Sequence, residues 1–340
     1  MSKTPKFDEA LDKILDNLQS HERVCKQCSA TFVVLAEDID MYKMLRVPPP
    51  NFCPKCRRQR RLAFANYTTL YKHQCQVPGH NESMVSCIPA TKPFPVYDFE
   101  YYWSDKWDRQ GQYRNYDAAK DFLSQFNDLF RTAPQPTLSR DPSSINSEYT
   151  LYGLQLKNCY YVFGGLNAED CYYGVWSIYS KQCVDVLLSL ECELLYESVY
   201  QLKCYNCNFY YFSQNCLDCD LIYDCRNCSN CFGCVNLRNK KHCFFNKQLT
   251  EEEYKKRRAE INLGDRSVLE KYQKQFWNLV KESPIRAVRN ERCQNVVGNY
   301  LVNCSNCYMA FWIQHSQNVR YGDFTIHMKD RMDFSMSFES

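Results

Sequence analysis

Residues 204–243, CYNCNFYYFSQNCLDCDLIYDCRNCSNCFGCVNLRNKKHC, repeat a pattern whose step is twelve residues. Extending that step toward the N-terminus gives one column of eight positions, and seven of them are cysteine. The column consists of Cys159, Cys171, Cys183, Leu195, Cys207, Cys219, Cys231 and Cys243. Because cysteine makes up only 22 of the 340 residues, chance does not explain seven matches, and the segment is a repeat.

Four other columns follow the same step. Apolar residues lie four and seven positions after the cysteine column, small residues lie nine positions after it, and Asn, Asp or Gln precedes most of its members. The four columns are Phe163, Val175, Leu187, Val199, Tyr211, Tyr223 and Val235; Leu166, Ile178, Leu190 and Leu202; Ala168, Ser180, Cys192, Cys204, Cys216 and Cys228; and Asn158, Asp170, Gln182, Asn206, Asp218 and Asn230.

These columns predict a mainly β fold built on a β-solenoid with twelve-residue rungs. Positions 0, +2 and +4 alternate as one short strand with its apolar side inward, and positions +7 and +9 form a second strand. We expect Gly164–Gly165, Ser177 and Ser189 at one turn. The Asn/Asp column belongs at the other turn, since both residues tolerate the left-handed conformation. One coil cannot bury its own face, so like residues of successive coils should stack. A 24-residue rung is the alternative, and it would place neighbouring column cysteines on opposite walls.

The chemistry of the column cysteines has three interpretations. They are reduced thiols that pack the interior, ligands of additional soft metal ions, or partners in disulfides within a rung, such as Cys204/Cys207, Cys216/Cys219 and Cys228/Cys231. Residues 1–10 are polar and lack an apolar signal-peptide core, so we expect a reducing cytoplasm and favour thiols. No apolar run approaches 18 residues, and we therefore expect no membrane association.

Two Cys-x-x-Cys pairs precede the repeat. Cys25 and Cys28 form the first pair, and after 24 residues Cys53 and Cys56 form the second. Each such turn directs two thiolates at one point, and two turns complete a tetrahedron. The spacing predicts an N-terminal zinc ribbon with one structural Zn²⁺, and four sulfur ligands leave no position for a catalytic water. Free or disulfide-bonded cysteines are the alternative.

A basic segment follows the second pair. The net charge of the chain is only +3, but residues 43–73 carry eight Lys or Arg and no Asp or Glu. Arginine forks bind phosphate, and neighbouring aromatic side chains stack on bases. We therefore expect RNA or DNA to bind at this segment, and the alternative is a solvated or ion-paired helix face. The candidate contacts are Arg57, Arg58, Arg60, Arg61 and Lys72.

The sequence predicts five segments. They are residues 1–78 with an N-terminal helix and the ribbon, 79–148 with aromatic residues and one helix, 149–247 with the solenoid, 248–290 as a helical insertion, and 291–340 as resumed solenoid. Capping signatures at Thr250–Glu253 and Ser267–Glu270 predict the helices of the insertion. Because an uncapped sheet edge invites association, we expect these helices or a second chain to cover residues 322–340.

Four stretches carry a resemblance that spans nearly the whole chain. They are Cys53–Cys56 with the arginine-rich tail to Phe64, Lys92–Tyr97, Trp103–Asp108 and Asn230–Asn239. With these stretches the chain resembles an uncharacterised family of zinc-ribbon proteins with Cys/Tyr/Asn repeats, found in ultra-small uncultured bacteria and giant viruses. Members often carry the label "caib/baif family", which implies a CoA-transferase, but nothing in these residues supports that activity. The resemblance implies the ribbon-plus-repeat architecture and no established role.

The resemblance also implies a second zinc site made of two more Cys-x-x-Cys pairs. This chain keeps Cys75, whereas Pro78, Asp98 and Tyr101 occupy the other three places. We therefore expect a single metal ion.

The leading functional prediction is a non-enzymatic scaffold. The ribbon and its arginines would bind a polyanion, and the solenoid would present a surface to a protein partner or to a second copy of the chain. The alternative is a structural component of a large assembly such as a virus particle. An enzyme acting on polysaccharide would need paired carboxylates on one face. Its candidates are scattered: Asp185, Glu197, Asp218, Asp220 and Asp224.

Overall fold

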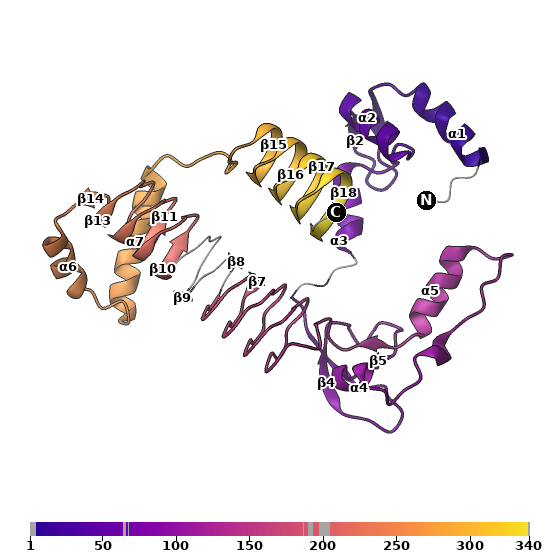
Figure 1. Cartoon of the computed structure of the whole chain (residues 1–340), viewed down its shortest axis with the longest axis horizontal. Helices are drawn as coiled ribbons and strands as arrows, with labels where there is room; N and C mark the ends of the chain where they lie inside the picture. Colours follow the sequence, from indigo (N-terminus) through magenta and orange to yellow (C-terminus); the bar gives the residue numbers. More distant parts are fainter. Residues whose placement is uncertain are drawn as a thin grey trace. The chain divides into compact units, whose positions relative to one another are not determined.

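The computed structural model describes residues 5–63, 66, 68–185, 187–189, 193–196 and 205–338, and strand outweighs helix in it. The chain forms two compact units (Figure 1). Unit 1 consists of residues 1–65 and 286–340, and unit 2 consists of residues 66–285. This division differs from the predicted segments, because residues 291–340 group with the N-terminal segment and not with residues 149–247. Across the described residues, no helix combines the length and the apolar character that crossing a membrane requires.

Unit 2 begins with short elements around a small core. Phe99, Leu138, Leu151 and Phe163 are buried together there. The elements are β3 (Tyr71–Gln74), β4 (Ser83–Ser86), β5 (Val96–Tyr97), α4 (Phe99–Trp103), the 3-10 helix η1 (Gln110–Gln112), α5 (Phe122–Thr132) and β6 (Gln135–Pro136).

From residue 145 onward, unit 2 pairs in parallel with the chain twelve residues later. Bridges run from Ile145–Lys157 to Tyr172–Val184, and strand pairs continue the step, with Cys219 opposite Cys231 and Cys231 opposite Cys243. The predicted twelve-residue step is therefore confirmed, and the 24-residue alternative is wrong. The strands are β7 (Val175–Ser177), β8 (Leu187–Ser189), β9 (Glu193–Tyr196), β10 (Tyr205–Tyr211), β11 (Leu217–Tyr223), β12 (Ser229–Phe232), β13 (Lys241–Phe244) and the antiparallel β14 (Lys247–Gln248).

Within one coil, the inward position recurs every third residue. In the coil of β11 the four inward side chains are at most 1% exposed, and they are Cys219, Ile222, Cys225 and Cys228. The column cysteines point inward as predicted. The predicted alternation of positions 0, +2 and +4 is wrong, however, because a strand with a period of two would have placed Leu221 inside the coil.

The period of three arises from left-handed corners. In the coil of β11, the residue before each inward side chain has φ between 48° and 53°. Each coil therefore has four corners instead of the two turns predicted. The four residues at these corners are Asp218, Leu221, Asp224 and Asn227. The Asn/Asp column occupies one corner, as predicted, and its side chains bond from coil to coil: Asn206 Nδ2 donates to Asp218 Oδ1 at 2.7 Å.

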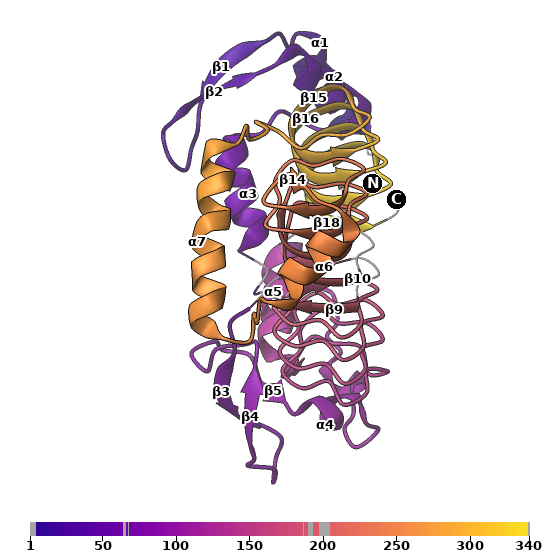
Figure 2. The same ribbon diagram turned by 90° about the vertical axis from the view of Figure 1, so that its left-hand side faces the viewer.

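The +4 column lies outside the coils, and helices cover its last members. Tyr223 and Val235 pack with Phe276 and Val280 of α7 (Arg266–Glu282) and with Tyr254 of α6 (Glu251–Ala259). Helix α7 contacts β11 and α6 contacts β13, and Figure 2 shows both helices against the coils of unit 2. These are the two helices of the predicted insertion. Thr250 forms the expected capping box with Glu253, whereas Asp265, and not Ser267, is the N-cap of α7.

The cysteines that the structure describes are all free thiols, and the only set of three or more side chains among those residues with metal-ligand spacing is Cys25, Cys28, Cys53 and Cys56. The described part of the repeat therefore contains no disulfide and no further group of side chains with metal-ligand spacing. Several predicted members lie outside the described residues, namely Phe64, Leu190, Cys192, Glu197, Val199, Leu202 and Cys204.

Unit 1 contains a second parallel stack. Its interior repeats the small and aliphatic composition of the first, with Leu301, Cys304, Cys307, Ala310 and Ile313 buried. The four strands pair in chain order, and Val319 is an inward member, as predicted. They are β15 (Gln294–Val302), β16 (Ser305–Gln314), β17 (Gln317–Ile326) and β18 (Lys329–Phe338).

One glycine sets the register of the first strand in this stack. The pairing of β15 with β16 shifts by one residue between Val297 and Gly298, from an eleven-residue step to a twelve-residue step. Gly298 has φ 156°, and a Cβ there would lie 1.9 Å from the carbonyl oxygen of Ala310. Only glycine fits this close approach.

The N-terminal segment of unit 1 covers the last strand of the stack. Helix α3 (Pro54–Leu62) and helix α2 (Ala36–Leu45) both contact β18. The structure thus shows the N-terminal segment against this strand, and cover by residues 250–283, which belong to unit 2, or by a second chain stays a prediction. The remaining elements of the segment are α1 (Pro5–Asp16), β1 (His21–Val24) and β2 (Thr31–Val34).

Candidate metal centre

The first cysteine pair lies in the turn of the β1–β2 hairpin. Cys25 N donates to Ala30 O at 2.9 Å, and Ser29 N donates to Cys25 O at 2.9 Å. Ser29 adopts φ 59°, so the chain reverses within one residue after Cys28. This tight reversal brings both thiols to the same end of the hairpin.

The second pair lies at the start of α3. Cys53 is the N-cap, Pro54 occupies the first turn, and Cys56 follows within that turn. Proline is favoured there because the position needs no N–H donor. The Arg23 guanidinium holds the preceding loop by donating to Pro49 O and Pro50 O at 3.3 and 3.0 Å. The loop is thereby fixed against the hairpin that carries the first pair.

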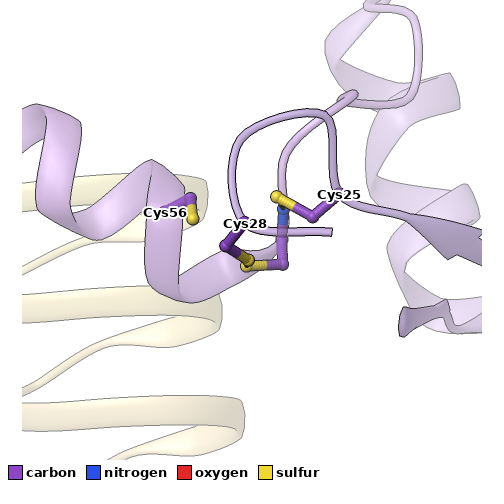
Figure 3. Close-up of side chains that lie close together, drawn as sticks. Cys25, Cys28 and Cys56 are labelled. Atoms are coloured by element: carbon purple, nitrogen blue, oxygen red, sulfur yellow. Dashed lines mark hydrogen bonds between the residues drawn. The ribbon is translucent and has the colours of Figure 1, made fainter. Parts of the chain in front are cut away.

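The four sulfur atoms lie close enough to hold a metal ion (Figure 3). All four are within 4.8 Å of one another, and the Sγ atoms of Cys28 and Cys53 are 3.8 Å apart. A tetrahedral site with Zn–S bonds of about 2.3 Å places its sulfurs about 3.8 Å apart. Cys25, Cys53 and Cys56 are buried and Cys28 is exposed. The four cysteines predicted as ligands are thus brought together closely enough to hold a metal ion.

Backbone hydrogen bonds favour the thiolate form of one cysteine, Cys25. Burial opposes ionisation of Cys25, but hydrogen bonds from the N–H groups of Cys53, Cys28 and Gln27 outweigh it and lower the pKa of Cys25 to about 6. Burial, followed by hydrogen bonding to the other cysteines, raises the pKa of Cys56 to about 12. A bound cation favours the thiolate form of every ligand, so metal binding would release the remaining protons.

The predicted arginine cluster does not form one free basic face. Arg57 Nε lies 2.7 Å from Asp333 Oδ2, and Arg61 Nη1 lies 3.3 Å from Asp333 Oδ1. The side chains of Arg57 and Arg61 are only 10% and 20% exposed. Burial also lowers the pKa of Arg61. These two arginines hold α3 on β18.

The other predicted contacts are exposed but differ in surroundings. Arg58 Nε pairs with Asp323 Oδ2 at 2.6 Å, while 53% of its side chain remains exposed. Arg60 stacks over the Phe52 ring at 4.7 Å. Lys72 is exposed on β3 and belongs to unit 2, so it is not part of the arginine cluster. Lys55, which the prediction omitted, lies between the two cysteines of the second pair and is exposed.

A buried ion pair provides a second attachment of the N-terminal segment to the stack. Asp38 of α2 accepts from Arg320 Nε at 2.5 Å and from Tyr321 Oη at 3.0 Å. Its other bond, from Leu35 N at 3.1 Å, caps the helix. Asp38 is 1% exposed, so its charge is compensated entirely by these partners.

The sequence did not reveal the acidic partners. Asp38, Asp323 and Asp333 belong to no motif, and their partners lie far away in sequence. One indirect signal was present: a helix with four arginines and no acid in residues 43–73 needs anions from elsewhere if it packs against another element.

At Cys75, Pro78, Asp98 and Tyr101, where the resemblance implied a second zinc site, the described residues contain no metal-ligand cluster. Cys75 is buried, and its sulfur accepts a hydrogen bond from Asp98 N at 3.3 Å. Asp98 in turn caps α4 by accepting from Glu100 N and Tyr101 N. Cys75 and Asp98 are therefore engaged in hydrogen bonds within unit 2.

Comparisons of the chain with family models, with curated proteins and with solved structures gave no match.

Proposed function

We propose that the chain is a non-catalytic scaffold in which one structural zinc ion fixes the cap of a β-solenoid. The observation that carries the proposal is that one helix, α3, joins the sulfur donors to the ion pairs. It starts at two of the four sulfur donors. Its three arginines Arg57, Arg58 and Arg61 pair with Asp323 and Asp333 of the stack. A metal ion that fixes the start of this helix fixes the ion pairs along it.

The donor set supports zinc in a structural role. Four thiolates with a separation near that of a tetrahedral site are the usual ligands of structural Zn²⁺. With all four positions filled by sulfur, no position remains for a water or substrate, and this supports a role without catalysis.

The parallel stacks support the solenoid interpretation. Both repeat a twelve-residue step with small residues inward and left-handed corners, so successive coils present equivalent residues in rows on the outer surface. Such rows suit the binding of an extended partner. The exposed basic residues Lys55, Arg58 and Arg60 support the part of the proposal in which that partner is a polyanion, RNA or DNA.

The experiment is metal analysis of protein purified without added metal. We expect one zinc per chain, and the Cys53→Ser variant should retain none at stoichiometric level. Cys87→Ser, a half-buried cysteine outside the cluster, is the matched control and should retain one zinc. Iron in place of zinc, two or more equivalents, or no metal would overturn the proposal.

A further inference from the structure

Helix α5 of unit 2 carries an apolar face that the described part of the chain leaves exposed. No residue of the helix is buried. Four of its large apolar side chains are between 44% and 69% exposed, and they are Phe122, Leu123, Phe126 and Phe130. The Phe94 ring meets one end of the face, edge-on to Phe130 with the ring centroids 5.1 Å apart. Figure 1 shows α5 apart from the coils of the same unit, so the coils do not cover this face.

Three rings of this face form a row along the helix. Phe122, Phe126 and Phe130 are four residues apart, so they lie on one side of the helix. The ring centroids of neighbours are 6.2 and 6.1 Å apart, at interplanar angles of 22° and 19°. Leu123 and the half-buried Leu129 widen the row into a stripe. Single exposed apolar residues are common on a surface, whereas a continuous stripe on a helix is a packing surface.

The area of this face is close to what a dimer needs. The Tyr116 ring lies 6.4 Å from the Phe122 ring and extends the row, and Tyr113 and Tyr116 are 77% and 65% exposed. Since one large aromatic side chain can bury about 150–250 Å², these six side chains together offer on the order of 700 Å² per copy. The largest apolar patch of a typical monomer is about 300–600 Å², and a standard interface buries about 800 Å² per partner. The face therefore fits an interface slightly below the standard size.

The order of the apolar residues along α5 is self-complementary. Counted outward from Phe126, Phe122 mirrors Phe130 and Leu123 mirrors Leu129. An antiparallel pair of α5 helices with both Phe126 side chains on a twofold axis places each of these residues level with its counterpart in the second copy. Rings then meet rings and leucines meet leucines, which is the condition for a twofold interface between identical chains.

The polar residues of α5 fit the same arrangement. Gln125 and Asn127 flank the stripe at its centre, mirror each other and carry no charge. Asp121, the N-cap, is level with Arg131 of the last turn in the second copy. A parallel pair would instead place Asp121 beside Asp121 and Arg131 beside Arg131, and it would also align the two helix dipoles. The charges therefore favour the antiparallel pair.

We propose that α5 is a dimerisation element whose partner is α5 of a second copy of this chain, paired antiparallel about a twofold axis at Phe126. The central rings should contribute most of the affinity, because interface energy concentrates in aromatic residues near the centre. A dimer carries two solenoids, and an extended partner that engages both is bound with higher avidity. The inference does not depend on the metal site, since α5 belongs to unit 2 and the four cysteines belong to unit 1.

The first test is sedimentation equilibrium of the full chain over a wide range of concentrations. The mass of the parent protein should rise from one chain to two. Phe126→Asp should weaken the dimer at least about a hundredfold, because it places two charges at the centre of the interface. Tyr179→Asp is the matched control, since Tyr179 is 49% exposed on the solenoid and its φ of 49° suits aspartate. A parent that stays monomeric, or a Phe126→Asp variant that dimerises like the parent, would overturn the proposal.

The second test examines the antiparallel register. Phe122→Asp and Phe130→Lys should each weaken the dimer, and mixing the two variants should restore association. In the mixed dimer the new aspartate meets the new lysine, and the native Phe130 meets the native Phe122. A mixture of Phe122→Asp with Phe122→Lys is the control and should gain nothing, because these positions are not level in an antiparallel pair. Rescue in the control alone would show a parallel pair, and rescue in neither mixture would exclude the axis at Phe126, so both results overturn the proposed arrangement.

Other occupants of the face would give different results. Because no residue of α5 is buried, the substitutions should leave the melting temperature of dilute, monomeric protein unchanged. A monomeric parent whose melting temperature falls in Phe126→Asp would show that another part of the same chain covers the face. A monomeric parent that sediments with vesicles of phosphatidylcholine and phosphatidylserine, and loses this in Phe126→Asp, would assign the face to a lipid surface. Either result would overturn pairing with a second copy.

Discussion

Arg58 and Asp323, which are 265 residues apart in the sequence, form an ion pair in unit 1 with Nε 2.6 Å from Oδ2. Arg58 follows the second cysteine pair by two residues, and Asp323 lies on the next-to-last strand of the stack. Together with the Asp333 and Asp38 pairs, this contact makes the N-terminal segment the lid of the C-terminal stack. The edge strand β18 is thus covered by the chain itself, which is one of the usual protections against edge-to-edge association.

The Asp38–Arg320 pair is expected to be the strongest single electrostatic contact of the lid. Asp38→Ala leaves Arg320, 7% exposed, without its buried counterion, and such losses cost about 3–5 kcal/mol. Chemical denaturation followed by a probe in unit 1 should show the loss. The control is Asp40→Ala, an exposed acid of the same helix, for which we expect a change below about 0.5 kcal/mol. Equal stability of the two variants would show that the buried pair contributes nothing net.

The inward positions of each coil should limit the size of the side chain that they can hold. Cys219 faces an interior that admits only small side chains there, so Cys219→Leu should overpack the coil and destabilise unit 2 by about 1–3 kcal/mol. Leu217, two residues earlier, is 48% exposed, and Leu217→Ala should be nearly neutral. Thermal unfolding of the two variants tests this, and a neutral Cys219→Leu would contradict the interior position of the column.

Gly298 should be intolerant of a side chain for a local reason. A Cβ would collide with the backbone carbonyl of Ala310, which cannot rotate away as a side chain could. We expect Gly298→Ala to loosen the β15–β16 pairing, with faster amide exchange in residues 294–302 and a lower melting temperature. Gly264, which lies in a loop with only the Asn262 side chain nearby, is the control position for the same substitution. A fully protected β15 in the alanine variant would show that the register shift does not need glycine.

Thiol labelling should distinguish three classes of cysteine. In metal-loaded protein the column thiols are buried and should stay unmodified by iodoacetamide. Burial raises the pKa of Cys87 and of Cys293, so their labelling should be slow at pH 7 and should accelerate at a higher pH than for a free thiol, because only the thiolate reacts. After chelation of the metal, Cys28, the exposed member of the cluster, should become labelled before any column cysteine does. Early labelling of Cys219 or Cys231 by mass spectrometry would contradict the closed interior.

The twelve-residue step and the four sulfur donors could be predicted because both are local regularities. One column of small residues is enough to predict the step, and two Cys-x-x-Cys turns are enough to predict the donor set. The geometry inside a coil was missed because its corners use residues such as Tyr161, Tyr173 and Leu221, which rarely adopt positive φ. The signal was nevertheless present: the run Cys225, Cys228, Cys231 and Cys234 has a spacing of three that no alternating strand explains.

The lid could not be predicted because its contacts join residues more than 260 positions apart. An isolated aspartate in a strand is indistinguishable by sequence from any exposed acid. The prediction of a free arginine surface failed for the same reason, since counting charges in residues 43–73 cannot include anions from Asp323 and Asp333. The stacked rings of Tyr300, Trp312 and Phe324 also have a twelve-residue signature, which is hard to recognise beside the stronger cysteine column.

The most direct test of the proposed scaffold is hydrogen–deuterium exchange of the intact chain before and after metal removal by a chelator. We expect metal removal to accelerate exchange in the β1–β2 hairpin, in α3 and also in β18, because the ion pairs of α3 depend on the position of its first turn. Strands β10 to β13 of unit 2 should exchange as before. If the hairpin and α3 lose protection while β18 keeps it, the metal site serves only the N-terminal segment, and the claim that it fixes the cap of the stack is contradicted.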